Sequence, residues 1–176
     1  MIEYNEILES DKQEIENFWI RYWRDRNLSY DINFLKLDRM ETCFIFRNDG
    51  EFCMMSGIDD ISEFIPNTIR ILTRATTTHY KPKTWGKYIE EIFFTNVVAG
   101  ISVNWCLENH PSKDIVITTN EDSRITKVLR KYDRNWMTER GIEKVYGVEQ
   151  VIWDIDYENC INMTNQWKSK NEINKL

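Results

Sequence analysis

The hydrophobic pattern between residues 68 and 110 changes its period once, from that of a strand to that of a helix. Residues 69–78 begin with alternating apolar and polar side chains and are rich in β-branched residues, as in a buried strand. Residues 88–109 carry apolar side chains at helical spacing, on a face that includes Tyr88, Ile92, Val98, Ile101 and Trp105. Pro111 cannot continue this helix. The pattern therefore predicts a strand, a short loop and one long helix.

A basic, glycine-containing loop at residues 81–87 joins the predicted strand to the predicted helix. Its sequence is Lys-Pro-Lys-Thr-Trp-Gly-Lys. The backbone N–H groups at a helix start have no intrahelical partners, and the helix dipole is positive there, so such a loop is suited to bind a phosphate. Solvated turns are also commonly rich in lysine, so the same residues fit a turn without a ligand. The sequence alone does not decide between a phosphate-binding loop and a solvated turn.

The rest of the chain alternates between the two periods, with turn residues where the period changes. Ser10 and Gln13 form a capping box for a first helix, and Asp-Gly at 49–50 between two apolar runs predicts a hairpin. Gly141 would end a turn, and Gly147 would separate the last two strands. The predicted elements are a helix at 10–26, an irregular or short helical stretch at 27–38, a hairpin at 43–56, a strand at 114–120, a helix at 123–136, and strands at 142–146 and 148–156.

The order of these elements describes one domain. A strand, a helix and a second strand in succession form a βαβ unit, so the strands at 69–78 and 114–120 are predicted to be parallel neighbours. No long linker divides the chain. We therefore expect a single domain over residues 1–156 and a polar tail over 157–176, with room for a short helix around Gln166 and Trp167.

Composition and charge narrow the class of protein. The chain has 176 residues, of which 41% are hydrophobic and 30% charged, a balance typical of a soluble globular domain. A net charge of −6 argues against nucleic acid as a partner, because nucleic-acid binding needs a basic face. No apolar run approaches the roughly 20 residues of a membrane span, and the acidic N-terminus lacks a signal-peptide core. We expect a cytoplasmic protein with no membrane partner.

The four cysteines do not form a C-x-x-C pair. Cys43 and Cys53 could face each other across the predicted hairpin, but reduced packing residues are the simpler interpretation for a cytoplasmic protein. His79 and His110 are the only histidines, and neither lies near a cysteine pair. No metal is therefore expected.

The order of elements resembles the GNAT superfamily of N-acetyltransferases over residues 15–155. That family holds the pyrophosphate of acetyl-CoA with an Arg/Gln-x-x-Gly-x-Gly/Ala loop. Lys83 and Gly86 can be laid on its first basic residue and first glycine, whereas Tyr88 stands in place of the second small residue. The resemblance implies an α+β (α/β three-layer) fold, in which a mixed, mostly antiparallel twisted sheet with a central parallel strand pair has helices on both faces.

The resemblance also implies a set of site residues. The backbone of Ala75, Thr76 and Thr77 would bind the acyl carbonyl and the pantetheine arm, between parallel strands that splay apart. Asn120 would also contact the cofactor, and Tyr132 would protonate the departing thiolate. His79, at the strand exit, could accept a proton near neutral pH or be an ordinary loop residue. The residues implied for the phosphates are Lys81, Lys83, Thr84, Trp85, Gly86 and Lys87.

The expected activity is transfer of an acyl group from acetyl-CoA, or another acyl-CoA, to the amine of a small molecule or peptide, by a monomer or homodimer. The first helix, the stretch 27–39 and the final hairpin would form the acceptor cleft, and the acidic balance would suit a cationic amine. A non-catalytic GNAT-like binding module is an alternative. Use of an aminoacyl-tRNA donor is a further alternative, against which the net negative charge weighs.

Overall fold

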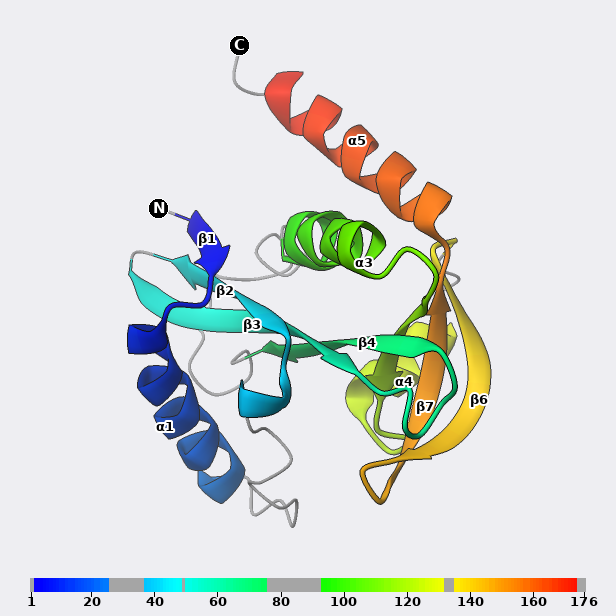
Figure 1. Cartoon of the computed structure of the whole chain (residues 1–176). Helices are drawn as coiled ribbons and strands as arrows, with labels where there is room; N and C mark the ends of the chain where they lie inside the picture. Colours follow the sequence, from blue (N-terminus) through cyan, green and yellow to red (C-terminus); the bar gives the residue numbers. More distant parts are fainter. Residues whose placement is uncertain (1, 26–36, 49, 76–92, 132–134, 174–176) are drawn as a thin grey trace.

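The fold is a single seven-stranded sheet with helices on both faces (Figure 1). The computed structural model describes residues 2–25, 37–48, 50–75, 93–131 and 135–173. The strands lie in the spatial order β1-β2-β3-β4-β5-β7-β6. Their bounds are β1 Ile2–Glu6, β2 Thr42–Asn48, β3 Glu51–Asp60, β4 Thr68–Ala75, β5 Asp114–Thr119, β6 Met137–Val145 and β7 Val148–Ile155.

The helices divide between the two faces of this sheet. The helical elements are α1 Glu9–Asp25, the 3-10 turn η2 Leu37–Arg39, the π-helical segment η4 Phe93–Ser102, α3 Val103–Asn109, α4 Arg124–Lys131 and α5 Tyr157–Ile173. Figure 1 shows α1 on one side of β2 and β3, and α3 and α5 on the other. The predicted long helix is helical throughout its described part, 93–109, but its first ten residues have the wider π turn.

The predicted pairing of the central strands is confirmed. β4 and β5 are parallel neighbours, and the other pairs of neighbouring strands in the sheet are antiparallel. The mixed, mostly antiparallel sheet with a central parallel pair follows from this arrangement. A helical crossover leads from β4 to β5, as the βαβ pattern indicates.

Both predicted hairpins are present. β2 and β3 form the first hairpin, and Gly50, just before β3, has a φ of 81° that favours glycine. In the turn between β6 and β7, Tyr146 and Gly147 have φ values of 50° and 79°, the positive pair of a type I′ turn. Cys43 pairs with Gly57, so Cys43 and Cys53 do not face each other.

The three cysteines whose side chains are described are buried and free of disulfides. They are Cys43, Cys106 and Cys160. Burial raises the pKa of each thiol to about 12, with neighbouring carboxylates adding to the shift. These thiols are protonated packing groups at neutral pH, as the sequence indicates.

Several predicted boundaries are wrong. The N-terminal residues form the edge strand β1, which the sequence pattern did not predict. The first helix begins at Glu9 rather than after Ser10. Leu8 is its N-cap residue, and the Leu8 N–H donates to Asp11 Oδ2 at 2.9 Å. Gly141 lies inside β6 at a bulge, with a φ of 148°, and does not end a turn. α4 is described only to Lys131, and Trp136 lies in a turn beyond it.

The C-terminal segment forms the 17-residue helix α5, which is longer than the short helix expected around Gln166 and Trp167. It packs against η4. Cys160 of α5 is buried in the main hydrophobic cluster, between the sheet and the helices η4 and α3. Among the described helices, none is both long enough and apolar enough to cross a membrane.

Two smaller clusters lie on the other face of the sheet. One joins Ile15 of α1 to Leu72 of β4 and to side chains of β2 and β3. The second joins Val116 and Ile152 to Ile61 and Ile65, which follow β3. Each Å² of apolar surface removed from water contributes about 25 cal/mol of stabilising free energy, so burial on both faces stabilises the central strands.

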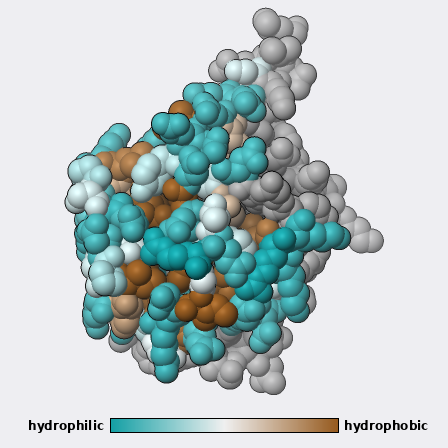
Figure 2. All heavy atoms as spheres, turned by 90° about the vertical axis from the view of Figure 1, so that its right-hand side faces the viewer, coloured by the Kyte–Doolittle hydropathy of each residue, from teal (hydrophilic) through white to brown (hydrophobic). Residues whose placement is uncertain are grey.

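The outer edge strand β6 is protected by charge. Four exposed charged side chains, Glu139, Arg140, Glu143 and Lys144, lie along it. Figure 2 views this side of the molecule and shows hydrophilic residues spread over it, with hydrophobic ones between them. Charged side chains on an edge strand discourage pairing with another sheet.

Candidate active site

The central parallel strands separate toward their carboxyl ends. The β4–β5 ladder runs only from Thr68 opposite Asp114 to Ile71 opposite Ile117. Beyond Ile71, β4 continues to Ala75 along β3, and β5 continues to Thr119 along β7. The two strands therefore follow different neighbours over their last residues, and the β4–β5 ladder does not extend to them. This is the splay that the sequence resemblance implies.

A chain of hydroxyl groups lies at the carboxyl end of β5. Thr119 Oγ1 accepts a hydrogen bond of 2.8 Å from the indole Nε1 of Trp153. The Thr126 hydroxyl lies 2.7 Å from Thr119 Oγ1 and donates to the Asn120 carbonyl oxygen at 2.6 Å. Thr119 and Thr126 are buried, so these bonds satisfy polar atoms that would otherwise be costly. They fix the end of β5 to α4.

Asn120 and Ser123 shape the turn that starts α4. Ser123 Oγ accepts the Thr126 N–H at 3.2 Å, which is the bond of an N-cap residue. Asn120 Oδ1 accepts the Asp122 N–H at 3.2 Å, which forms an Asx turn. Asn120 thus lies where the resemblance implies, at the end of the separated strand. Its contact with a cofactor remains a prediction.

Replacing Thr119 with valine should destabilise the protein by about 1–3 kcal/mol, because the Trp153 N–H would be left buried without an acceptor. Thr118→Val is the matched control, since the described contact of the Thr118 hydroxyl is a longer one of 3.5 Å to Arg70. Urea unfolding followed by tryptophan fluorescence measures both variants. Equal losses of stability in the two variants would contradict the role given to Thr119.

A buried ion pair crosses the opposite face of the sheet. Arg70 of β4 donates from Nε and Nη2 to the two carboxylate oxygens of Asp59 on β3, at 2.8 and 2.5 Å. Their side chains are 1% and 4% exposed. Such a two-pronged pair is strong and geometrically specific. Arg70 Nη1 also lies 3.5 Å from the hydroxyl of Thr118, in the separated part of β5.

Tyr146 connects this ion pair to the β6–β7 turn. Its hydroxyl lies 3.5 Å from Asp59 Oδ2, and its ring packs edge-on against Phe64 with centroids 4.5 Å apart. Burial raises the pKa of Tyr146, and the charge of Asp59 adds to this effect. The phenol is therefore protonated at neutral pH. The turn of the β6–β7 hairpin therefore contacts β3 and β4 through Tyr146.

Gln150 is a buried amide on the same face. It is 5% exposed and shares its side of β7 with Ile152, because side chains two apart in a strand point the same way. Val151 pairs with Thr119, so Gln150 lies just beyond the carboxyl end of β5. No hydrogen-bond partner for its amide is found within the described residues. A buried unpaired amide calls for an explanation.

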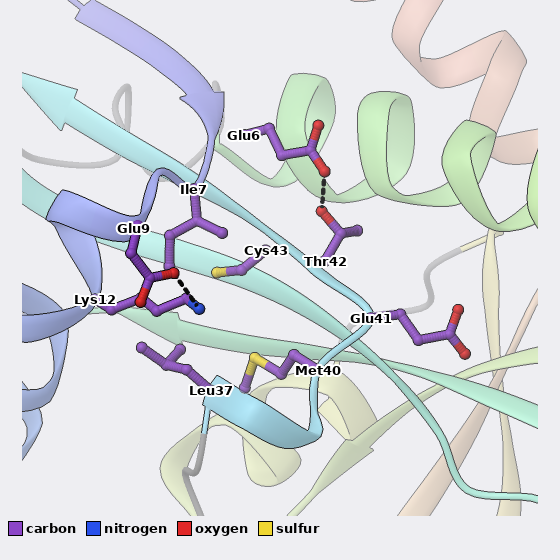
Figure 3. Close-up of a pocket in the computed structure, with 9 residues that line it drawn as sticks. All are labelled: Glu6, Ile7, Glu9, Lys12, Leu37, Met40, Glu41, Thr42 and Cys43. Atoms are coloured by element: carbon purple, nitrogen blue, oxygen red, sulfur yellow. Dashed lines mark hydrogen bonds and ion pairs between the residues drawn. The ribbon is translucent and has the colours of Figure 1, made fainter.

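A cavity of about 500 Å³ lies elsewhere, between the β1–α1 junction and the start of β2 (Figure 3). Its carboxylates are already engaged: Glu6 accepts from the Thr42 hydroxyl at 2.5 Å, Glu9 pairs with Lys12 at 2.6 Å, and Glu41 lies 2.6 Å from His110 Nε2. Because its lining comes from the β1 side of the sheet, this cavity does not form part of the β4–β5 site.

Most residues predicted for the site fall outside the described residues. These are Thr76, Thr77, His79, Lys81, Lys83, Thr84, Trp85, Gly86, Lys87 and Tyr132. The backbone of Ala75 is described and pairs with Met54, at the end of β4 where the resemblance places it. Within the described chain, no group of three His, Cys, Asp or Glu side chains is arranged to hold a metal ion.

Sequence reasoning missed four polar residues on the face of the sheet that carries the buried ion pair, here called the second face: Asp59, Arg70, Tyr146 and Gln150. One signal was available, because Arg70 is a charged residue between Ile69 and Ile71 in a strand that is predicted to be buried. A charged residue within a buried strand needs a partner or a ligand.

Comparison with solved structures decides the fold. An uncharacterised protein from Bacillus halodurans matches at a TM-score of 0.62 and 12% identity, over 96% of this chain and 91% of its own. The aminoglycoside acetyltransferase AAC(6')-Ib, in complex with paromomycin and acetyl-CoA, matches at 0.58 and 13%, over 90% and 94%. The spermidine/spermine N-acetyltransferase SpeG from Vibrio cholerae matches at 0.54 and 12%, over 92% and 98%.

The chain has the GNAT fold. This confirms the fold that the order of elements predicts, although no protein-family model and no curated protein sequence matches the chain. The GNAT fold explains why the β4–β5 separation lies at the centre of the sheet. Identities of 6–16% to eight of the matching structures leave the substrate and the chemistry to be argued from this chain's own residues.

Proposed function

We propose that the protein is an acyl-CoA-dependent N-acyltransferase that transfers an acetyl group from acetyl-CoA to an amine. The observation that carries this proposal is the end of the β4–β5 ladder at Ile71 and Ile117, within a GNAT fold. Structures with this fold include one described with acetyl-CoA and one with coenzyme A and kanamycin. The acyl-CoA is a co-substrate, and the proposed reaction needs no metal.

The open edges of the separated strands fit an acyl-CoA arm. Backbone N–H and C=O groups that have left the ladder can bond to a pantetheine amide as they would to a neighbouring strand. We assign the backbone of Ala75, Thr76 and Thr77 to the acyl carbonyl and the arm, and the 81–87 loop to the phosphates. Asn120 lies at the end of the facing strand.

The proposed reaction requires one nucleophile and two proton transfers. The amine nitrogen attacks the thioester carbonyl carbon, a C–N bond forms, and the C–S bond breaks. Donor N–H groups stabilise the developing oxyanion. The amine loses a proton to a base, for which His79 is the candidate. The departing thiolate takes a proton from an acid, for which Tyr132 is the candidate.

Replacing Tyr132 with phenylalanine should lower kcat by about 100-fold, the usual scale for one general acid, while the affinity for acetyl-CoA stays unchanged. The measurement is release of the CoA thiol in the presence of a panel of amines. If the Tyr132→Phe variant transferred the acyl group at the wild-type rate, Tyr132 would not be the acid. Binding of acetyl-CoA without transfer to any amine would favour a non-catalytic GNAT-fold module.

A further inference from the structure

Two arginines lie within cation–π distance of the Tyr146 ring, on the face of the sheet that carries the Arg70–Asp59 ion pair. The Cζ atom of Arg39 in η2 lies 5.0 Å from the ring centroid, and that of Arg70 lies 5.5 Å from it. These are cation–π distances. Tyr146 adopts a φ of 50°, which is uncommon for a side chain of this size. The stack joins η2, β4 and the β6–β7 turn.

The charges of this stack do not cancel. Asp59 neutralises Arg70 through its two bonds. Arg39 is exposed, and within the described part of the chain its guanidinium forms no ion pair. Two guanidinium groups and one carboxylate leave one positive charge, carried by Arg39. The net charge of −6 predicted a cationic acceptor, but the local charge here has the opposite sign.

The stack adjoins the separated strands. Arg70 reaches Thr118 in the open half of β5, and Tyr146 packs against the cluster that contains Ile152. Gln150 shares the face of Ile152 and brings its buried amide to the carboxyl end of β5. Among the described residues, a guanidinium without an ion pair and an amide without a hydrogen-bond partner therefore lie on one face, on the elements expected to form the acceptor cleft.

We propose that the acceptor is an amine that also carries an anionic group, as a free amino acid does, and that Arg39 binds this anion while Gln150 hydrogen-bonds the same acceptor. The inference rests on the proposed acyltransferase function. Arg39 suits the role because a guanidinium matches a carboxylate with two parallel hydrogen bonds. Stacking on Tyr146 holds it in place before the acceptor arrives.

The test compares amino acids with their own carboxamides as acceptors, with spermidine and kanamycin as cationic amines, by release of the CoA thiol. The KM should be lower for an amino acid than for its carboxamide. Arg39→Gln should raise the KM for the amino acid about 10-fold or more, the scale of one charge-assisted bond, without changing the KM for acetyl-CoA. Arg39→Lys should recover part of the loss.

Lys144→Gln is the control, because it also removes one positive charge, but on β6 rather than η2, at an exposed position that alternates with buried Val145. Gln150→Met should also raise the KM for the amino acid, with no fall in the melting temperature, since no described partner is lost. A fall of several degrees would assign Gln150 to structure alone.

Three outcomes would overturn the proposal while acyl-CoA binding stands. They are a preference for carboxamides or cationic amines, an unchanged KM in Arg39→Gln, and no transfer to any amino acid. Failure of acetyl-CoA to raise the melting temperature of the wild-type protein is a separate result, because it would overturn the proposed function itself.

Discussion

Arg70→Met should lower the free energy of unfolding by about 3–5 kcal/mol, which is among the largest effects expected of a single substitution in this chain. The reason is that Asp59, whose side chain is 4% exposed, would keep its charge in the interior without the guanidinium that neutralises it. A loss of this size is a large part of the stability of an ordinary domain. Urea unfolding followed by circular dichroism measures it.

Two controls separate the buried charge from the loss of a side chain. The double variant Arg70→Met/Asp59→Leu replaces both partners with apolar groups and should recover most of the stability. Arg130→Met removes an arginine that also bonds two carboxylates, those of Glu121 and Glu139, but at the surface. It should leave the unfolding midpoint nearly unchanged. If Arg70→Met and Arg130→Met behaved alike, the account of the ion pair would be wrong.

The same pair shows why the second face of the site could not be predicted from the sequence. Arg70 and Asp59 are 11 residues apart, and Tyr146 is 87 residues beyond Asp59. The contact between Arg70 and Asp59 depends on the antiparallel register of β3 with β4, and the contact with Tyr146 depends on where the β6–β7 turn lies. Local periodicity contains neither piece of information.

Where a signal is local, the sequence predicted the fold. Asp49-Gly50 marks the first hairpin, and Gly147 marks the second, because both turns need positive φ. Gly141 was misinterpreted for the same reason, since a bulge within a strand and a turn use the same freedom of glycine. β1 was missed because its five residues include Glu3, Asn5 and Glu6, and only pairing with β2 makes them a strand.

At the start of α1, the local signal predicts an N-cap at Ser10, two residues beyond the N-cap at Leu8 in the structure. Ser10 and Gln13 have the spacing of a capping box, but Leu8 and Asp11 have the spacing that the structure uses. The carboxylate of Asp11 accepts the Leu8 N–H, which is the reciprocal half of such a box. Asp11 also bonds to Arg47 of β2 at 3.1 Å, a tertiary contact that favours this start.

Charge reversal in the 81–87 loop should have the second large effect. Lys83→Glu/Lys87→Glu should weaken acetyl-CoA binding by about 100-fold or more, because each lost charge-assisted hydrogen bond costs about 1.5–3 kcal/mol. Repulsion between the new carboxylates and the phosphates adds to this loss. Titration calorimetry with acetyl-CoA gives the affinity, and free coenzyme A should show the same loss because it carries the same phosphates.

Lys144→Glu is the control for this charge reversal, since it changes the charge of an exposed lysine on β6, away from the loop in sequence. It should bind acetyl-CoA as the wild-type protein does. Retention of wild-type affinity in Lys83→Glu/Lys87→Glu would show that the phosphates bind elsewhere. An equal loss in Lys144→Glu would mean that overall charge, rather than the loop, controls binding.

The most direct test of the central claim is the melting temperature of the wild-type protein with and without acetyl-CoA. A ligand held between β4 and β5 binds only the folded chain, so at 100 times its dissociation constant it should add about 2.7 kcal/mol of stability. For a domain of this size that corresponds to a rise of roughly 5–10 °C. No rise at millimolar acetyl-CoA would contradict the claim that the separated strands form an acyl-CoA site.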